Sequence, residues 1–400
     1  MVRREHRSLF LLLALIAALG PMTMQIMMPA LPAIQREFGV SVAQAQLAFS
    51  VFVFTMGPSL LLYGPLSDRY GRRPVLTLAI GIFCMGTLMC LLSPSLGWLV
   101  AGRAIQALGA AAGLVITRAL LSDLFGREGM ATALSWMTMA MVIPPMLAPS
   151  LGGLLVDQVS WRGIFFILLL AGGVVLVFTL RYLPDPPATE AQRESSWIDK
   201  YRTVLGRRAF YPYALQGVLI IGMFYGFMAG APYLMVDVMG RPATEYGLFF
   251  LLPAGGYLLG SYLSARLSRR LGINRMVLLG ALLALAFTLP LVLVTGFGWW
   301  VPIAFFLPMT LITVANGIAV PSTQSGAISA VPEASGTASS MIGFLQQAVG
   351  AVVIQVVGLL QNDTPWPMVG VVLASAVLSA VGAVLLQRRP AGNPATSAVR

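Results

Sequence analysis

The sequence predicts an all-α polytopic membrane protein whose twelve transmembrane helices form two pseudo-symmetric six-helix bundles. Only 10% of the 400 residues are charged and 58% are hydrophobic, whereas about 25% of the residues in soluble proteins are charged. A soluble protein of this composition could not cover its surface with polar groups, so soluble enzymes are excluded. Crossing a bilayer takes about 20 apolar residues. Twelve apolar runs of about that length cover residues 8–30, 45–66, 75–93, 97–120, 130–156, 163–182, 211–235, 245–265, 276–296, 299–321, 335–360 and 366–386.

The positions of the basic residues support this number of helices. Twenty of the 25 Lys and Arg residues lie in the two tails and in every second connection, and only three lie in the intervening connections. Because positive residues stay on the cytoplasmic side, we expect both termini in the cytoplasm of a bacterial inner (plasma) membrane. The first run has no small-residue cleavage site after it, so it predicts a retained helix rather than a signal peptide.

The connection in the middle of the chain divides it into two halves. It opens with a polar, proline-rich stretch, and residues 197–205 then place Trp197, Ile198, Tyr201, Val204 and Leu205 at helical spacing. This pattern predicts a short amphipathic helix lying on the inner membrane surface. The predicted organisation is an N-terminal bundle at 1–182, a cytoplasmic linker at 183–210, a C-terminal bundle at 211–387 and a cytoplasmic tail at 388–400.

The two halves contain similar basic segments. Residues 64–73 read GPLSDRYGRR and residues 261–270 read SYLSARLSRR, with five matches in ten positions at an offset of 197. Each segment follows the second helix of its half, so the similarity indicates an internal duplication, which is a common way to build transporters.

Two arginines lie within the fourth run, Arg103 and Arg118, and no carboxylate lies in the middle of any run. An arginine at membrane depth normally faces a cavity or a partner, so both are candidates for substrate binding or coupling, together with Gln25 and Gln106. The alternative is that each arginine extends its charge to the nearer membrane surface.

Polar, aromatic and thioether side chains recur in the other runs. A cavity lined by them suits hydrophobic, loosely specified compounds, including cations, although helix packing and lipid contact explain any single residue equally well. The candidates are Met22, Met24, Phe49, Phe52, Met137, Met141, Gln216, Phe224, Tyr225, Phe249, Tyr257, Asn316, Gln346 and Gln347.

Signals for catalysis are absent from the sequence. It contains no zinc-protease, nucleophile-elbow or phosphate-loop motif and no pair of Cys and His residues. We therefore expect neither an enzyme nor a metal or cofactor site. The net charge of +11 is spread over short islands, which does not predict nucleic-acid binding.

Residues 64–76, GPLSDRYGRRPVL, resemble the signature loop of the major facilitator superfamily, G-x-L-x-D-R-x-G-R-[RK]-x-x-L, at every defined position. In that family the loop is a charged latch on the cytoplasmic side that favours the outward-facing state. The resemblance implies a major facilitator fold and a latch made of Gly64, Asp68, Arg69, Gly71, Arg72 and Arg73. Asp68 is expected to face a helix N-terminus or an arginine such as Arg118.

The next two runs resemble family motifs as well. LVAGRAIQALGAAAG at 99–113 is similar to the pattern that holds the family's intramembrane arginine, here Arg103. IPPMLAPSLGGLL at 143–155 is similar to the proline–glycine motif of drug antiporters, matching at Pro149, Gly152 and Gly153. Together with MMPALPAI at 27–34, these motifs resemble the Bcr/CflA group of drug:proton antiporters.

The resemblance implies a monomeric exporter of small hydrophobic or amphipathic drugs or metabolites that works by alternating access and draws its energy from the proton gradient. One departure leaves the coupling open, because Gln25 stands where many members of the group carry an acidic residue. The alternatives are a proton-independent facilitator or an exporter of one metabolite and, more distantly, a membrane enzyme or receptor that does not transport.

Overall fold

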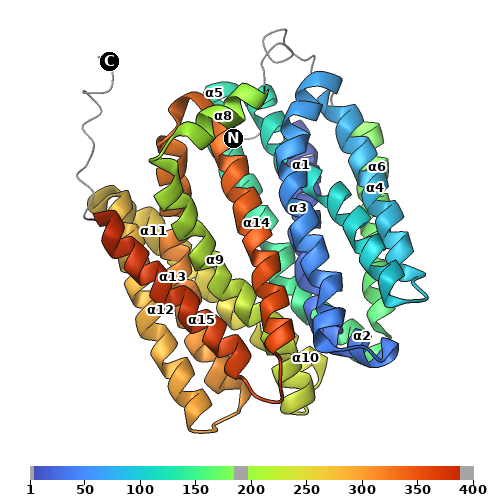
Figure 1. Cartoon of the computed structure of the whole chain (residues 1–400). Helices are drawn as coiled ribbons and strands as arrows, with labels where there is room; N and C mark the ends of the chain where they lie inside the picture. Colours follow the sequence, from blue (N-terminus) through green and yellow to red (C-terminus); the bar gives the residue numbers. More distant parts are fainter. Residues whose placement is uncertain (1–3, 184–196, 388–400) are drawn as a thin grey trace.

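The computed structural model describes residues 4–183 and 197–387, without the side chains of residues 4–8 and 122–142. These parts are almost entirely helical and contain no strand (Figure 1). The elements are α1 (Arg4–Ile26), η1 (Met28–Ala30), α2 (Leu31–Phe38), α3 (Val42–Tyr70), α4 (Arg72–Leu91), α5 (Leu96–Gln158), α6 (Trp161–Tyr182), α8 (Trp197–Gly206), α9 (Phe210–Tyr233), η2 (Leu234–Val238), α10 (Ala243–Phe249), α11 (Leu251–Leu271), α12 (Ile273–Gly296), α13 (Pro302–Ser329), η3 (Pro332–Ala334), α14 (Ser335–Leu360) and α15 (Trp366–Gln387).

Helix α5 contains two of the expected membrane crossings. A straight helix of its 63 residues would be about 95 Å long. However, Gly113 lies against Ile16 and Gly152 lies against Ile26, both on α1. Gly113 and Gly152 are 39 residues apart along α5, whereas Ile16 and Ile26 are only ten residues apart along α1. The two arms of α5 must therefore run in opposite directions along α1.

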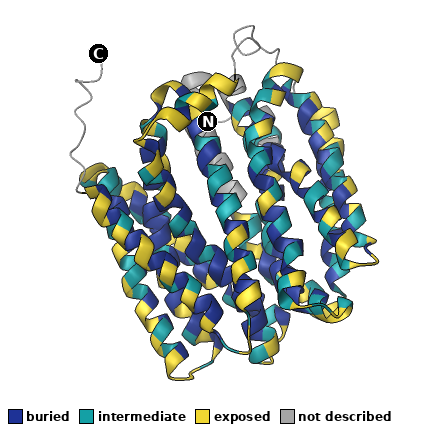
Figure 2. Ribbon diagram, in the orientation of Figure 1, coloured by how far each residue is buried: buried dark blue, intermediate teal, exposed yellow. Residues whose placement is uncertain are grey.

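The helices that can cross a membrane agree with the all-helical fold expected from the sequence. Eleven in the described part are long and apolar enough, among them Leu96–Leu121 in the first arm of α5. The second arm falls in the expected run 130–156, whose first residues lie among those without described side chains. Large apolar side chains such as Leu78, Val174 and Leu289 are exposed. Figure 2 shows exposed positions, in yellow, along the outer helices of the bundle. The protein is therefore a multi-pass membrane protein whose outer surface suits contact with lipid.

Several helices are longer than their apolar runs, and glycines end two of them. Gly71 has φ 97° between α3 and α4, and Gly272 has φ 75° between α11 and α12. Each N–H donates to the carbonyl of a serine four residues earlier, Ser67 and Ser268 respectively. Positive φ is a conformation that glycine adopts without strain.

These two turns correct the register of the internal repeat. Gly71 and Gly272 are 201 residues apart, whereas the sequence comparison gave an offset of 197. At 201, Leu66-Ser67-x-Arg69-x-Gly71 aligns with Leu267-Ser268-x-Arg270-x-Gly272. The error is four residues, close to one helical turn, which leaves each side chain on nearly the same helix face. Counting identities alone favoured the wrong turn because both segments are rich in arginine.

Helices meet closely where they carry glycine. A Cβ placed on Gly109 of α5 would lie 2.3 Å from the carbonyl oxygen of Ala79 on α4, and one on Gly260 of α11 would lie 2.0 Å from that of Val314 on α13. Small residues permit this backbone approach in membrane proteins, where lipid provides no hydrophobic drive between helices.

Helix α8 forms within the central connection, but it does not present one apolar face to the membrane as expected. Val204 is buried against Phe210 and other residues of the C-terminal half. The Tyr201 hydroxyl donates to the Leu61 carbonyl of α3 at 2.9 Å. Ile198 and Leu205 remain exposed, so the apolar residues of α8 are divided between protein contacts and the surface. Residues 184–196 and 388–400 lie outside the described residues.

The bundle has two different ends. We call the end with α8 and the glycine turns at Gly71 and Gly272 the basic end, which is at the top of Figure 1. The opposite end, with α2 and α10, is at the bottom.

Candidate functional site

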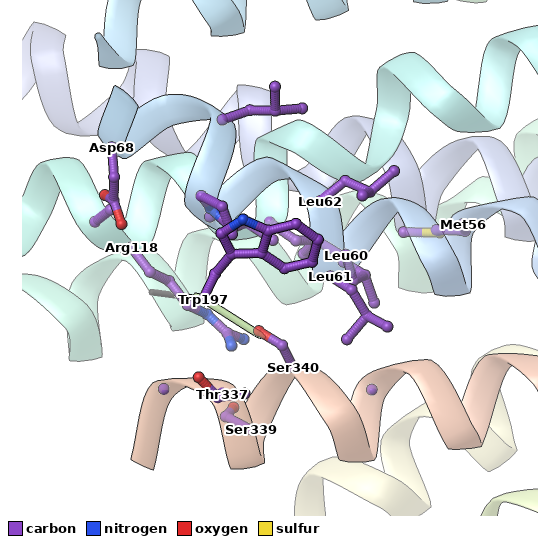
Figure 3. A pocket seen from close by; sticks show the side chains of 18 of the residues that line it. Met56, Leu60, Leu61, Leu62, Asp68, Arg118, Trp197, Thr337, Ser339 and Ser340 are labelled. Atoms are coloured by element: carbon purple, nitrogen blue, oxygen red, sulfur yellow. The ribbon is translucent and has the colours of Figure 1, made fainter. Parts of the chain in front are cut away.

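A cavity of about 940 Å³ is lined by residues of the basic end, such as Asp68 and Trp197, and by residues further along the helices, such as Met56 (Figure 3). Its walls come from α1, α3 and α5 on one side, from α13 and α14 on the other, and from α8 at the mouth. Helices from both halves of the chain therefore line one open cavity, which is where transporters built from repeats bind their substrates.

The inner part of the cavity is mainly apolar. Met24 and Met56 line it, and so do the polar amides of Gln346 and Gln347. The Tyr225 hydroxyl of α9 donates to Oε1 of Gln347 and lies 3.7 Å from Sδ of Met24. This contact links both halves of the chain beside the cavity, while thioether side chains can adapt to ligands of different shape.

The mouth of the cavity is basic. Asp68 accepts an ion pair from Nη1 of Arg72 at 2.6 Å, and the same nitrogen lies 2.6 Å from the Ser67 hydroxyl. Asp68 is therefore paired within its own segment, rather than with Arg118. Arg118 also lines the cavity and is exposed to it.

The opposite end is closed by contacts between helix backbones. A Cβ placed on Gly153 in the second arm of α5 would lie 2.3 Å from the Ala243 carbonyl oxygen of α10. One placed on Gly247 of α10 would lie 2.4 Å from the Pro149 carbonyl oxygen. Gly152 faces the other way, toward the Ile26 carbonyl oxygen of α1. The two adjacent glycines thus let α5 fit between α1 and the C-terminal half.

A carboxylate joins the two halves at this closed end. Asp157 near the end of α5 accepts hydrogen bonds from the backbone N–H groups of Ala243 and Thr244, at 3.2 and 2.7 Å, and from the Thr244 hydroxyl at 2.6 Å. Pro242 occupies the N-cap position of α10 and provides no side-chain acceptor. The first turn of α10 is therefore capped by the other half of the chain.

Arg103 lies in a buried hydrogen-bond network outside the cavity lining, with its Nη2 unpartnered among the described residues. It is fully buried, and its Nε donates to the Ala48 carbonyl at 3.0 Å while Nη1 donates to Gln106 Oε1 at 2.6 Å. Gln106 in turn donates to the Thr87 hydroxyl at 2.8 Å. The guanidinium carbon also lies 4.0 Å from the ring centre of Phe52. This arginine therefore joins α3, α4 and α5 within one half.

The comparisons with known proteins agree with this geometry. The family described as Major Facilitator Superfamily matches residues 13–355. The chain belongs to this superfamily.

Two of its relatives are named for drug resistance. The chain is 31% identical to Multidrug resistance protein D of Escherichia coli K12 over 349 residues, which cover 86% of this chain and 87% of the relative. It is 26% identical to the Bicyclomycin resistance protein homolog of Haemophilus influenzae, covering 97% and 98%. The solved structure of the xylose transporter XylE from E. coli, in a partially occluded inward-open conformation, has a TM-score of 0.71 at 14% identity and covers 96% and 97%. This last similarity concerns the fold alone.

Within the superfamily fold, the predicted site residues separate into several groups. Those that line the cavity are Met24, Gly64, Asp68, Arg69, Arg72, Arg118, Gln346 and Gln347. Arg73 lies outside the lining, where it donates to the Leu180 carbonyl of α6. Gln25 does not line the cavity either, and its Oε1 is buried with no hydrogen-bond partner among the described residues.

Other predicted cavity residues are packed between helices. Phe49 and Phe52 are fully buried in the N-terminal half. Gln216 donates to the Ser379 carbonyl at 3.1 Å and accepts from its hydroxyl at 3.0 Å, joining α9 to α15. Phe249 packs on the Phe306 ring at 5.4 Å. Among the remaining candidates, Asn316 is buried, Met22 and Phe224 are partly buried and Tyr257 is exposed, and none lines this cavity. The side chains of Met137 and Met141 lie outside the described residues.

Sequence reasoning missed several residues of the site. Trp197 and Lys200 of α8 reach the cavity mouth, and Thr337, Ser339 and Ser340 of α14 line the opposite wall. The three hydroxyls lie within a stretch of four residues near the start of an apolar helix, which is a signal that a search for polar residues in the runs could have found. Asp157 gave no signal, because its partners are 86 and 87 residues away.

The buried network predicts that Arg103 stabilises the N-terminal half rather than binding substrate. We expect Arg103→Leu to lower the thermal stability of the purified protein, because the Ala48 carbonyl and Gln106 Oε1 lose their donors at a cost of about 1–3 kcal/mol each. Thermal unfolding in detergent measures the change. Arg266→Leu, on the exposed face of α11, is the matched control. An unchanged melting temperature together with a loss of substrate affinity would instead indicate direct contact with substrate.

Proposed function

We propose that this protein is a secondary transporter that exports small hydrophobic or amphipathic drugs or metabolites by alternating access. The observation that carries the proposal is a cavity between the two halves at the basic end, together with the close backbone contact of α5 and α10 at the opposite end. Such an arrangement is one of the two states that a rocking mechanism requires. The names of the relatives support export of drugs, since two of them describe resistance.

The basic end is proposed to face the cytoplasm of a bacterial inner membrane, with both termini on that side. The support is the excess of Lys and Arg at this end, because positive residues remain in the cytoplasm. The cavity then receives substrate from inside the cell, and the structure represents the inward-facing state. Export requires the contacts at Gly153 and Gly247 to separate while the basic end closes.

We further propose that export is coupled to proton entry, as the drug-antiporter motifs suggest. A proton-independent facilitator is the second candidate, and Gln25 favours it because an amide does not carry a proton.

Transport by the protein in reconstituted vesicles distinguishes the proton-coupled exporter from the facilitator. Dye-loaded proteoliposomes in acidic buffer should release dye, and their lumen should acidify when substrate is added. Release that persists unchanged with a protonophore would support the facilitator, and no protein-dependent release in either condition would contradict export.

Gly153 is expected to control the inward-facing state. A methyl group in Gly153→Ala meets the Ala243 carbonyl, and overpacking of this kind costs typically 1–3 kcal/mol. Because the contact exists only when this end is closed, the variant should populate the outward-open state at least several-fold more. Labelling of a cysteine introduced beside Gly247 measures opening. The control is Gly173→Ala, where a Cβ has no neighbour within 4 Å, and equal labelling of the two variants would refute the assignment.

Asp68 is expected to be required for transport. Its replacement by asparagine leaves Arg72 without its carboxylate partner and removes the negative charge of the latch segment. Asp68→Asn should reduce dye export at least tenfold while the amount of protein in the membrane stays unchanged. Asp363→Asn, in an exposed loop between α14 and α15, is the matched control. Export at the wild-type rate by Asp68→Asn would show that the segment is not a latch.

A further inference from the structure

The side chains that line the cavity carry an excess of positive charge. Four of them are cationic, Arg69, Arg72, Arg118 and Lys200, and within the described lining the single carboxylate is Asp68. Asp68 is already paired with Arg72. The formal charge of the described lining is therefore +3, at the mouth of a chamber whose inner part is apolar.

Arg118 is the cation best placed to meet a ligand. It extends from α5 into the cavity (Figure 3), and it makes no hydrogen bond or ion pair with a described residue. The opposite wall presents the hydroxyl side chains of Thr337, Ser339 and Ser340. A guanidinium provides several N–H donors in a planar fork that matches a carboxylate, sulfonate or phosphate, and the hydroxyls can donate further hydrogen bonds.

The other arginine in this arm of the helix, Arg103, is buried and hydrogen-bonded, unlike Arg118. Both arginines lie in the first arm of α5, but Nε and Nη1 of Arg103 donate to Ala48 and Gln106, and its guanidinium lies over the Phe52 ring in the fully buried interior. No comparable set of acceptors surrounds Arg118 in the described part of the chain. Its charge is therefore available to a molecule that enters from the basic end.

We propose that the cavity selects amphipathic anions, with the anionic group at Arg118 and the apolar part directed toward Met24, Met56 and Leu60. This inference rests on the proposed export function and narrows its substrate class. The lining disfavours the cationic compounds expected from the aromatic and thioether residues, because a cation entering the mouth meets the net positive formal charge of the described lining.

The inference also concerns the energy source. A membrane potential that is negative inside drives an anion outward without a proton carrier in the protein. A transporter of anions can therefore use the potential in addition to any proton gradient, and it can work with Gln25 at the position where the related antiporters carry an acid.

Two dyes that differ by one sulfonate test the inference. The full chain in lipid nanodiscs is titrated with 8-anilino-1-naphthalenesulfonate and with its uncharged parent, N-phenyl-1-naphthylamine, and the fluorescence of empty nanodiscs is subtracted. We expect the sulfonate to bind at least tenfold more tightly. Arg118→Gln should remove most of this preference and leave the affinity for the uncharged dye unchanged, whereas Arg118→Lys should keep part of it. The control Arg269→Gln removes an exposed arginine at the basic end that is outside the lining.

Equal affinities of the wild type for the two dyes would overturn the inference, as would an equal loss of both in Arg118→Gln. If Arg118→Gln does not fold, wild-type titrations at 50 and 500 mM salt replace it. Sulfonate binding should then weaken several-fold with salt while binding of the uncharged dye does not, and the absence of that difference is contrary evidence.

Export of the uncharged dye from proteoliposomes without any preference for the anion would overturn the inference and leave the proposed function intact. Selective binding of the anion without transport of either dye would overturn the function alone.

Discussion

The contact between α5 and α10 is the constraint on which the rest of the structure depends. At Gly153 and Gly247 the backbones of the two halves approach so closely that a Cβ would lie 2.3–2.4 Å from a carbonyl oxygen. Contact at one end and separation at the other leave the cavity between the halves. The Asp157 cap adds hydrogen bonds to the same contact. Opening this end must therefore break directional contacts as well as separate surfaces, which favours two distinct states over a continuous range.

The two arginines of the first α5 arm show why position in the sequence does not determine role. Arg103 lies where α3 supplies a carbonyl acceptor and an aromatic ring and where Gln106 of α5 links it to Thr87 of α4, so it joins helices within one half. Arg118 lies about four turns further along, where α5 faces the cavity, so the same side chain remains available. In the sequence both are arginines at membrane depth, and only the packing of the neighbouring helices distinguishes their roles.

The sequence predicted the class of the fold well because membrane insertion depends on local properties. Apolar length, basic connections and glycine at the Gly71 turn are all visible along the chain. The interior of the bundle was predicted less well, since which face of a helix meets the cavity depends on contacts between distant segments. Phe49, Phe52 and Gln216 have the chemistry of cavity residues, but the first two pack within one half and Gln216 bonds to Ser379. Helix α8 was misplaced for the same reason, because nothing local indicates that Tyr201 bonds to α3.

The corrected repeat gives a physical reason for the unequal roles of the two halves. With an offset of 201 residues, Asp68 is equivalent to Arg269. Both precede a glycine turn of the same geometry, so duplication accounts for the scaffold. Asp68 lines the cavity and pairs with Arg72, whereas Arg269 is exposed outside it. A single change of charge at equivalent positions thus leaves one half with a carboxylate at the mouth and the other with none. The pairing of that carboxylate with Arg72 leaves Arg118 without an ion-pair partner among the described residues, so the mouth keeps a positive character.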